Sequence, residues 1–185
     1  MFRLSLTKVL STMVLAMTLG ATAPFAADQK KSQEPASDET ISKQVRHELL
    51  MLPYYGVFDN LAYSVESGVV TLEGEVAWPA LKPDAAAAVK HISGVQSVVN
   101  NIEVLPASFH DDRLRRALYR SIYGFAPLQK YGGGALPSIH IIVKNGHAVL
   151  VGVVTTEADK NSAGIRANLV PGVFSVENDL RVAKS

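Results

Sequence analysis

The sequence predicts an α+β fold that occurs twice, as two tandem αββαβ domains, each a mixed three-stranded sheet with two helices on one face. The first observation is an internal repeat, because residues 94–100 (GVQSVVN) return as residues 172–178 (GVFSVEN) at a shift of 78 positions. The other two are alternating apolar runs around turn signals and a helical apolar period that opens each copy. A period this long exceeds the roughly 20–50 residues of a solenoid unit, so each copy is expected to be a domain with its own core.

The helical period at the start of each copy predicts the first helix. Ser37 or Asp38 can cap it in the first copy, and Asp111 with Asp112 suits the N-terminus of its equivalent in the second. The apolar residues recur at intervals of three and four, which places them on one side of a helix. They are Ile41, Val45, Leu49 and Leu52 in the first copy, and Leu114, Leu118, Ile122 and Phe125 in the second.

A hairpin follows in each copy. Apolar and polar residues alternate on both sides of Ser67–Gly68 and of Asn145–Gly146. Asn-Gly is the strongest short hairpin signal, because both turn residues need a positive φ. Gly74 and Gly152 fall in the middle of the returning strands, on the side meant for the core. Since glycine weakens a strand unless another element packs close, we predict that a helix contacts both positions.

A second helix comes next. In the second copy Thr155 or Thr156 can cap it, and it runs to about Leu169 before a Pro-Gly stop. In the first copy it is expected over 85–92. Proline is tolerated only in the first turn of a helix, so Pro83 favours a start at that residue rather than at an earlier proline.

The last strand alternates apolar residues with an asparagine at equivalent positions, Asn100 and Asn178. A helix between the second and third strands permits a parallel crossover, which makes the sheet mixed. Both asparagines lie on the core-facing side, where we expect a buried amide that binds a loop backbone group and not a ligand.

The first residues predict export. A charged start, an apolar run over 9–19 that is too short to span a bilayer, and small residues after it are typical of a cleaved signal peptide. We expect this peptide over 1–27, with cleavage between Ala26 and Asp28. The mature protein is then expected in the periplasm, and not as an integral membrane protein.

Two domains are expected after the signal peptide and a polar, disordered spacer over 28–37: one over 38–106 and one over 107–185. The chain has no cysteine, so disulfides are excluded and each domain must be held by its core. The first domain has nine acidic and four basic residues (−5), and the second has ten basic and six acidic residues (+4). This difference is either neutral drift or a sign that the halves face different partners.

The repeated residues resemble the BON (bacterial osmotically induced and nodulation) domain family. The resemblance covers about residues 38–182, and it rests on paired units with a strand-ending glycine, a Gly-Val-x-x-Val-x-Asn entry to the last strand and a secretory signal. It implies tandem αββαβ domains in the cell envelope, associated with osmotic stress and with binding of phospholipid or other envelope surfaces, not with catalysis. Many members carry a lipidated cysteine near the N-terminus, which this chain lacks, so fixed attachment is not implied.

Few residues suit catalysis or metal binding. The five histidines include no i, i+4 pair, and His140 and His147 lie about three rungs apart on the outer face of one hairpin, where we expect them to be exposed. No Gly-x-Ser-x-Gly motif is present, and residues 132–134 (GGG) lack the ending of a phosphate loop, so they are expected to form a flexible loop. We therefore expect no enzyme, no metal, no cofactor and no nucleic-acid partner.

One helix face of the second copy combines basic and aromatic residues. Arg113, Arg116 and Arg120 fall within about 60° of one another on a helix, with Tyr119 and Tyr123 beside them and away from the core stripe. Arginine binds phosphate oxygens in bidentate fashion, and tyrosine favours membrane interfaces. These five residues form the predicted lipid-binding site. The alternative is that they cover a contact between the two domains.

The sequence thus favours a non-catalytic periplasmic binding module for envelope maintenance or osmotic and envelope stress, with anionic phospholipid as its ligand. The alternative is a protein-binding or chaperone-like envelope adaptor that uses the apolar segment 52–58 (LPYYGVF). That segment is either an exposed contact patch or a part of the core of its domain.

Overall fold

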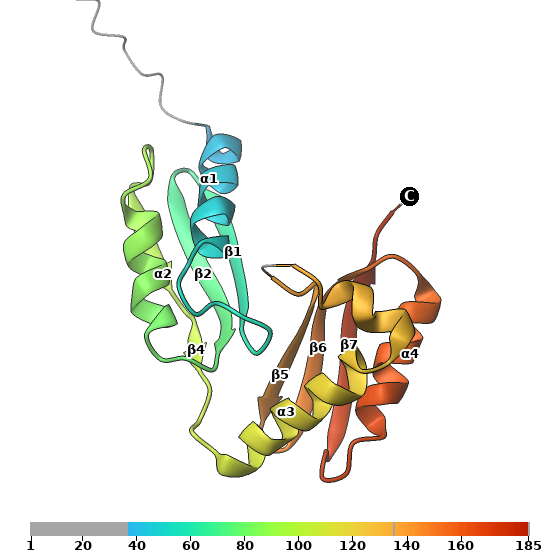
Figure 1. Cartoon of the computed structure of the whole chain (residues 1–185). Helices are drawn as coiled ribbons and strands as arrows, with labels where there is room; N and C mark the ends of the chain where they lie inside the picture. Colours follow the sequence, from blue (N-terminus) through green and yellow to red (C-terminus); the bar gives the residue numbers. More distant parts are fainter. Residues whose placement is uncertain (1–36, 135, 185) are drawn as a thin grey trace, which may run out of the picture. The chain divides into compact units, whose positions relative to one another are not determined.

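The computed structural model describes residues 37–134 and 136–184, so the expected signal peptide over 1–27 and nearly all of the spacer over 28–37 lie outside the described residues. The elements follow one another in the predicted order (Figure 1). Those of the first copy are α1 (Asp38–Leu50), β1 (Asn60–Glu66), β2 (Val69–Val76), α2 (Leu81–Lys90), β3 (Ser97–Asn100) and β4 (Glu103–Val104). Those of the second are α3 (Phe109–Tyr123), the 3₁₀ helix η1 (Ala126–Tyr131), β5 (Ile139–Lys144), β6 (His147–Val154), α4 (Glu157–Asn168) and β7 (Ser175–Val182).

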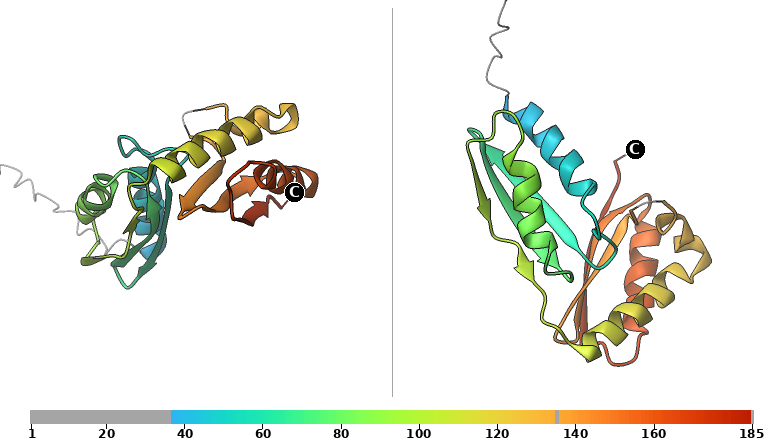
Figure 2. Two further views of the ribbon diagram at one scale, coloured as in Figure 1. Left: turned by 90° about the horizontal axis from the view of Figure 1, so that it is seen from below. Right: turned by 60° about the vertical axis from the view of Figure 1, so that its left-hand side comes forward.

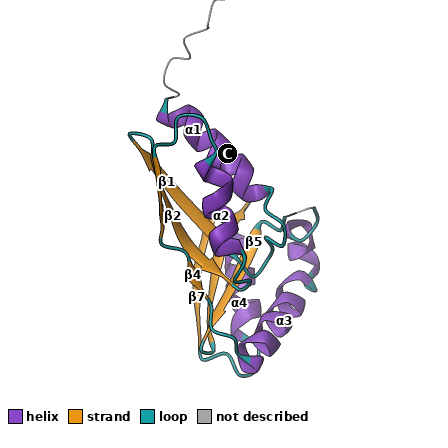
Figure 3. Ribbon diagram, turned by 90° about the vertical axis from the view of Figure 1, so that its left-hand side faces the viewer, coloured by secondary structure: helices purple, strands orange, loops and turns teal. Residues whose placement is uncertain are grey.

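Each copy forms one mixed sheet with β2 or β6 at its centre. β1 runs antiparallel to β2, whereas β3 and β4 run parallel to it, and β5, β6 and β7 repeat the arrangement. Within each copy both helices lie on the same face of the sheet, as Figures 2 and 3 show. The predicted α+β class, with two tandem αββαβ domains, is confirmed. Among the described residues no helix is long and apolar enough to cross a membrane.

Each copy also has its own core. The predicted helical stripes supply the helix side of both cores, while Leu52 and Phe125 follow the helix ends and pack partly buried against them. The first core consists of Ile41, Val45, Leu49, Val70, Leu72, Val76, Leu81, Ala85, Val89 and Ile102. The second is built around Leu114, Leu118, Ile122, Leu128, Ile139, Ile141, Val143, Leu150, Val154 and Leu180.

An aspartate in the first turn of each leading helix binds the hairpin turn of its copy. Asp38 accepts the two backbone N–H groups of the Ser67–Gly68 turn at 2.7 and 2.9 Å. Asp111 accepts those of the Asn145–Gly146 turn at 2.9 and 2.8 Å. All four turn residues have positive φ, between 51° and 81°. The turns therefore form where the sequence predicts them, and a helix side chain holds each one in place.

The mid-strand glycines are required by a neighbouring strand and not by a helix, so the reason predicted for them is wrong. Gly74 and Gly152 have φ of +113° and +129°, and a Cβ at either would lie 2.1 Å from a carbonyl oxygen, of Asn60 or Ser138. Those carbonyls belong to the beginning of the neighbouring hairpin strand. Glycine is needed here because, with this left-handed backbone, any side chain would point into the adjacent strand.

The second helix of the first copy begins earlier than predicted. α2 starts at Leu81, two residues before Pro83, which lies in the first turn, where its missing N–H is not needed. In the second copy Thr156 caps α4 by accepting a hydrogen bond from the N–H of Asp159 at 3.1 Å, as expected.

The third strand is continuous only in the second copy. In the first, β3 and β4 both pair with β2 in one register, with Leu72 opposite Asn100 and Glu75 opposite Glu103. The side-chain carbonyl of Asn100 accepts the N–H of Ile102 at 3.2 Å, which curls the backbone at the break. The amide groups of Asn100 and Asn178 donate to carbonyls in the first turns of α2 and α4 at 2.7 and 2.9 Å. Their role is structural, as predicted, but their partners lie in helices and not in loops.

The connection between α3 and β5 folds as η1, which the sequence did not predict. Its last residue, Tyr131, donates a hydrogen bond to the carboxylate of Asp159 at 2.8 Å and accepts the N–H of Thr155 at 2.8 Å. Hydrogen bonds from the hydroxyls of Thr156 and Tyr131 lower the pKa of Asp159 to about 2. The longer connection of the second copy is thereby tied to the beginning of α4.

The hydrogen bonds of Asp111 to the Asn145–Gly146 turn, here called the aspartate clamp, can be tested by replacing Asp111 with alanine. The variant leaves two turn N–H groups without their charged acceptor, so the free energy of unfolding should fall by about 2 kcal/mol. Urea unfolding followed by circular dichroism measures the loss. Asp179→Ala, an exposed position on β7, is the control, and an equal effect of both variants would contradict the role of the clamp.

The strand glycine of the second copy provides a second test. Gly152→Ala should lower the free energy of unfolding by about 3 kcal/mol, from backbone strain together with the clash against Ser138. Gly133→Ala is the matched control in the same copy, because a Cβ at Gly133 meets no atom within 4 Å. Thermal unfolding of both variants should show a large loss only for the first.

Candidate functional site: the exposed face of α3

Helix α3 presents the predicted basic residues on its outer side. Ser108 caps the helix by accepting the N–H of Asp111 at 3.2 Å, and the core stripe fixes which side is buried. Arg113, Arg116 and Arg120 are exposed, as predicted. Among the described residues none of the three forms an ion pair. Three guanidinium groups on one face are therefore available to an anion.

The two tyrosines of the predicted site separate. Tyr119 is 40% exposed and lies among the arginines, with its ring 4.9 Å from that of Tyr123. Tyr123 is buried in the second core, and its hydroxyl donates a hydrogen bond to the carbonyl of Ile139. Burial raises the pKa of Tyr123. The expected position of Tyr123 on the outer flank is wrong, because α3 ends there and Gly132, after η1, packs against its ring.

A fourth arginine of α3 is buried, which sequence reasoning missed. Arg115 donates to the carboxylate of Asp112 at 2.6 Å and to the carbonyl of Val143 at 2.7 Å. It therefore binds the helix to β5 and contributes nothing to the exposed face. Its place next to Leu114 on the buried side was the available signal, since a charge there needs internal partners.

The segment 52–58 is neither a free patch nor a filler of one core. Leu52 and Tyr55 pack against the first core, whereas Val57 and Phe58 pack against the second. The carbonyl of Val57 accepts the N–H of Ile141 on β5 at 2.7 Å. Both copies belong to one compact unit, and this segment is one of the places where they meet.

That contact reaches the edge of the basic face. The ring of Phe58 lies 6.4 Å from that of Tyr119 at a steep angle. A shallow cleft beside α3 is lined by Val57, Phe58, Arg116, Tyr119 and Arg120. The inter-domain alternative therefore applies to Tyr119, which meets Phe58 of the first copy, whereas the three arginines remain exposed.

A single buried carboxylate shapes this segment. Asp59 accepts the N–H of Gly56 at 3.0 Å and the N–H of Ala77, after β2, at 2.7 Å. Burial raises the pKa of Asp59, and the backbone hydrogen bonds oppose that shift. The carboxylate joins the loop before β1 to the loop after β2.

The histidines differ from the prediction at one position. The hairpin register places His147 opposite Lys144 and His140 opposite Val151, as predicted, and His147 is exposed. His140 is partly buried instead, because the segment 52–58 covers it. Its Nδ1 lies 3.1 Å from the carbonyl oxygen of Gly56, and its ring stacks on Tyr55 at 5.6 Å.

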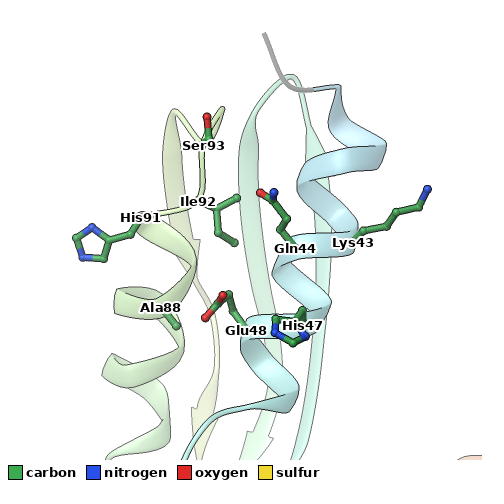
Figure 4. A pocket seen from close by; sticks show the side chains of 8 residues that line it. All are labelled: Lys43, Gln44, His47, Glu48, Ala88, His91, Ile92 and Ser93. Atoms are coloured by element: carbon green, nitrogen blue, oxygen red, sulfur yellow. The ribbon is translucent and has the colours of Figure 1, made fainter. Parts of the chain in front are cut away.

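A second hollow lies between α1 and the end of α2 (Figure 4). It is lined by Lys43, Gln44, His47, Glu48, Ala88, His91, Ile92 and Ser93. Figure 4 shows Glu48 and Ile92 pointing between the helices, while Lys43 and His91 point away. The polar groups do not converge on one point, so this groove has no built ligand site.

The second copy explains why that groove is open. At the 78-residue shift Arg166 stands where the first copy has Ala88. Arg166 donates to the carbonyl of Ser121 at 2.9 Å, and the hydroxyl of Ser121 donates to the carbonyl of Arg166 at 2.7 Å. These bonds bridge α3 and α4, and an alanine cannot make them.

Two regions of the chain, residues 37–106 and 128–184, match the BON domain. The chain belongs to the BON domain family. The first match includes α1, whereas the second begins after α3, where η1 lengthens the copy. As a member of this family, the protein is a tandem BON-domain binding module of the periplasmic envelope. BON domains are in general not catalytic.

Other comparisons add little to the family assignment. Among curated proteins no match is found. Two solved structures of CdsD, a structural protein of the type III secretion system of Chlamydia trachomatis, are similar at 13% and 14% sequence identity. They cover 77% and 78% of this chain and 96% and 93% of their own, with TM-scores of 0.31 and 0.28. Similarity at this level supports no conclusion about the function of the BON-domain protein.

The contact at His140 should weaken in acid. Burial lowers the pKa of His140 below its ordinary 6.5, so the native state resists a proton that the unfolded state accepts. Its contribution to stability is complete above about pH 6.5 and is lost as the pH falls below that value. Unfolding at pH 7 and pH 5 measures this, and His140→Gln should reduce the difference. His147→Gln, at an exposed position, should leave it unchanged.

Proposed function

We propose that this BON-domain protein is exported to the periplasm, where it attaches reversibly to anionic phospholipid through the outer face of α3 in envelope maintenance or envelope stress. The observation that carries the proposal is the set of three exposed arginines, Arg113, Arg116 and Arg120, without ion-pair partners among the described residues. Guanidinium groups bind phosphate oxygens in bidentate fashion, and these have no ion pair to break first, although Arg113 lies 3.4 Å from Nδ1 of His110. The proposed domains remain 38–106 and 107–185.

The cleft beside α3 supports a lipid as the phosphate carrier. Arg116 and Arg120 line it together with two apolar side chains of the segment 52–58 and with Tyr119. Tyrosine suits the boundary between polar and apolar surroundings. A phosphate flanked by apolar groups matches this lining better than a free inorganic anion does. Tyr123, being buried, takes no part in the proposed surface.

The leading helix of the first copy is a poorer anion surface. At positions equivalent to Arg116 and Tyr119 it carries Lys43 and Arg46. Lys43 is already paired with Glu39 at 2.6 Å. Since the first copy also has an excess of acidic residues, attachment is assigned to the second copy, and the first presents a different surface.

An adaptor that binds an envelope protein is the second candidate. The observation in its favour is that Tyr54, in the segment 52–58, is 75% exposed. Most of the rest of that segment packs against the two cores, which leaves this candidate a small surface. Vesicle binding separates the two functions, because only the first requires the protein to bind lipid alone.

Replacing Arg113, Arg116 and Arg120 together by glutamine should weaken binding to anionic vesicles about a hundredfold. Each arginine near an anionic surface contributes about 1 kcal/mol, and about 1.4 kcal/mol corresponds to tenfold. The domain should stay folded, because all three side chains are exposed. Flotation with phosphatidylglycerol-containing vesicles measures the change, and binding of the parent should fall as salt shortens the Debye length.

The matched control is the double variant Lys43→Gln with Arg46→Gln on α1. It removes charge from the equivalent helix and should bind vesicles like the parent protein. If both variants lose vesicle binding equally, the effect comes from the net charge of the protein and not from the face of α3. If the parent protein ignores anionic vesicles at low salt, the lipid function is wrong.

A further inference from the structure

Two aromatic side chains of the first copy contact each other while exposed to solvent. Tyr54 is 75% exposed and Trp78 is 53% exposed, with ring centroids 5.8 Å apart and planes 36° from parallel. They come from different loops, one between α1 and β1 and the other between β2 and α2. Neither belongs to a core cluster. Packing therefore does not account for two large aromatic groups at this point.

The backbone holds this pair in place at a cost. Tyr54 has φ of +68°, a left-handed conformation that is unusual and strained for an aromatic residue. The buried carboxylate of Asp59 binds the N–H groups of Gly56 and Ala77, each next to or near one of the aromatic residues. One internal group thus fixes both loops and sets the two rings against each other.

The second copy shows that the fold does not need the tryptophan. At the 78-residue shift the position of Trp78 is held by Thr156, the capping residue of α4. In the first copy α2 begins without a side-chain cap, at Ala80. The first copy therefore has an exposed indole where the same fold elsewhere uses a stabilising hydroxyl.

The pair adjoins the basic face of α3. Trp78 and Arg116 line one cleft, together with Phe58. Phe58 and Arg116 also line the cleft beside Tyr119 and Arg120. The two clefts share Phe58 and Arg116, which connects Trp78 of the aromatic pair with Tyr119 and Arg120 of the basic face. Tryptophan and tyrosine favour the headgroup level of a bilayer, and arginines bind the anionic headgroups there.

We propose that Tyr54 and Trp78 insert at the headgroup level of the anionic bilayer that α3 binds, as a second contact point supplied by the first copy. The inference rests on the proposed function and adds to it an apolar component that salt does not screen. Lipid attachment then has two parts: arginines that bind charge and an aromatic pair that enters the interface.

Trp78 is the only tryptophan of the chain, so its fluorescence reports on this point alone. Vesicles of phosphatidylglycerol and phosphatidylethanolamine should shift its emission to the blue, and brominated lipid should quench it. The variants Trp78→Thr, which installs the residue of the second copy, and Tyr54→Asn, which suits the left-handed backbone, should each bind these vesicles about tenfold more weakly in flotation. Ile165→Thr, which removes an exposed apolar group from α4, should bind like the parent protein.

The outcomes distinguish this inference from the function on which it rests. In one outcome the parent protein binds vesicles, the arginine variant loses binding, and both aromatic variants bind normally with no change in the emission of Trp78. The aromatic contact point is then wrong, and the lipid function stands. The pair would then face another partner, such as an envelope protein. If the parent protein does not bind at all, both proposals fail together.

Discussion

The architecture of each copy depends on the hydrogen bonds between one aspartate and the hairpin turn, made by Asp38 in the first copy and by Asp111 in the second. The aspartate joins the first turn of the leading helix to both N–H groups of the hairpin turn. The glycine carbonyl of the same turn then accepts the N–H of the residue just before the third strand, Gln96 at 2.8 Å in the first copy and Phe174 at 2.9 Å in the second. Helix, hairpin and parallel strand thus meet at one dipeptide. A short local turn becomes the junction that sets where the non-local elements begin.

Sequence reasoning found what local periodicity determines. The helical stripes, both turns, the parallel last strand and the exposed arginines follow from spacing and turn chemistry, and they lie where predicted. Three of the errors share one physical cause: they depend on which other segment of the chain covers or approaches the residue. Tyr123 is covered after η1, His140 is covered by the segment 52–58, and Gly152 is approached by a neighbouring strand. None of these neighbours can be read from a local pattern.

The differences between the copies indicate more about function than their shared residues do. The shared glycines and asparagines build the fold, whereas the candidate surfaces come from positions that diverged. Arg116 of the second copy is equivalent to Lys43 of the first, and Trp78 of the first copy is equivalent to Thr156 of the second. In each pair the other copy shows what the fold tolerates or requires at that position. An internal duplicate therefore acts as a reference for the other copy. Residues that depart from it without a packing reason are the ones to examine for binding.

The hydrogen bond between Val57 and Ile141 has a further consequence. β5 is an edge strand, paired only with β6 among the described elements, and an open edge invites pairing with foreign strands. The segment from the first copy covers part of that edge. Because the first copy is also the first to be synthesised, its loop is ready before β5 exists. The first copy can thus cover the edge of β5 as soon as the second copy folds, which protects that edge from aggregation.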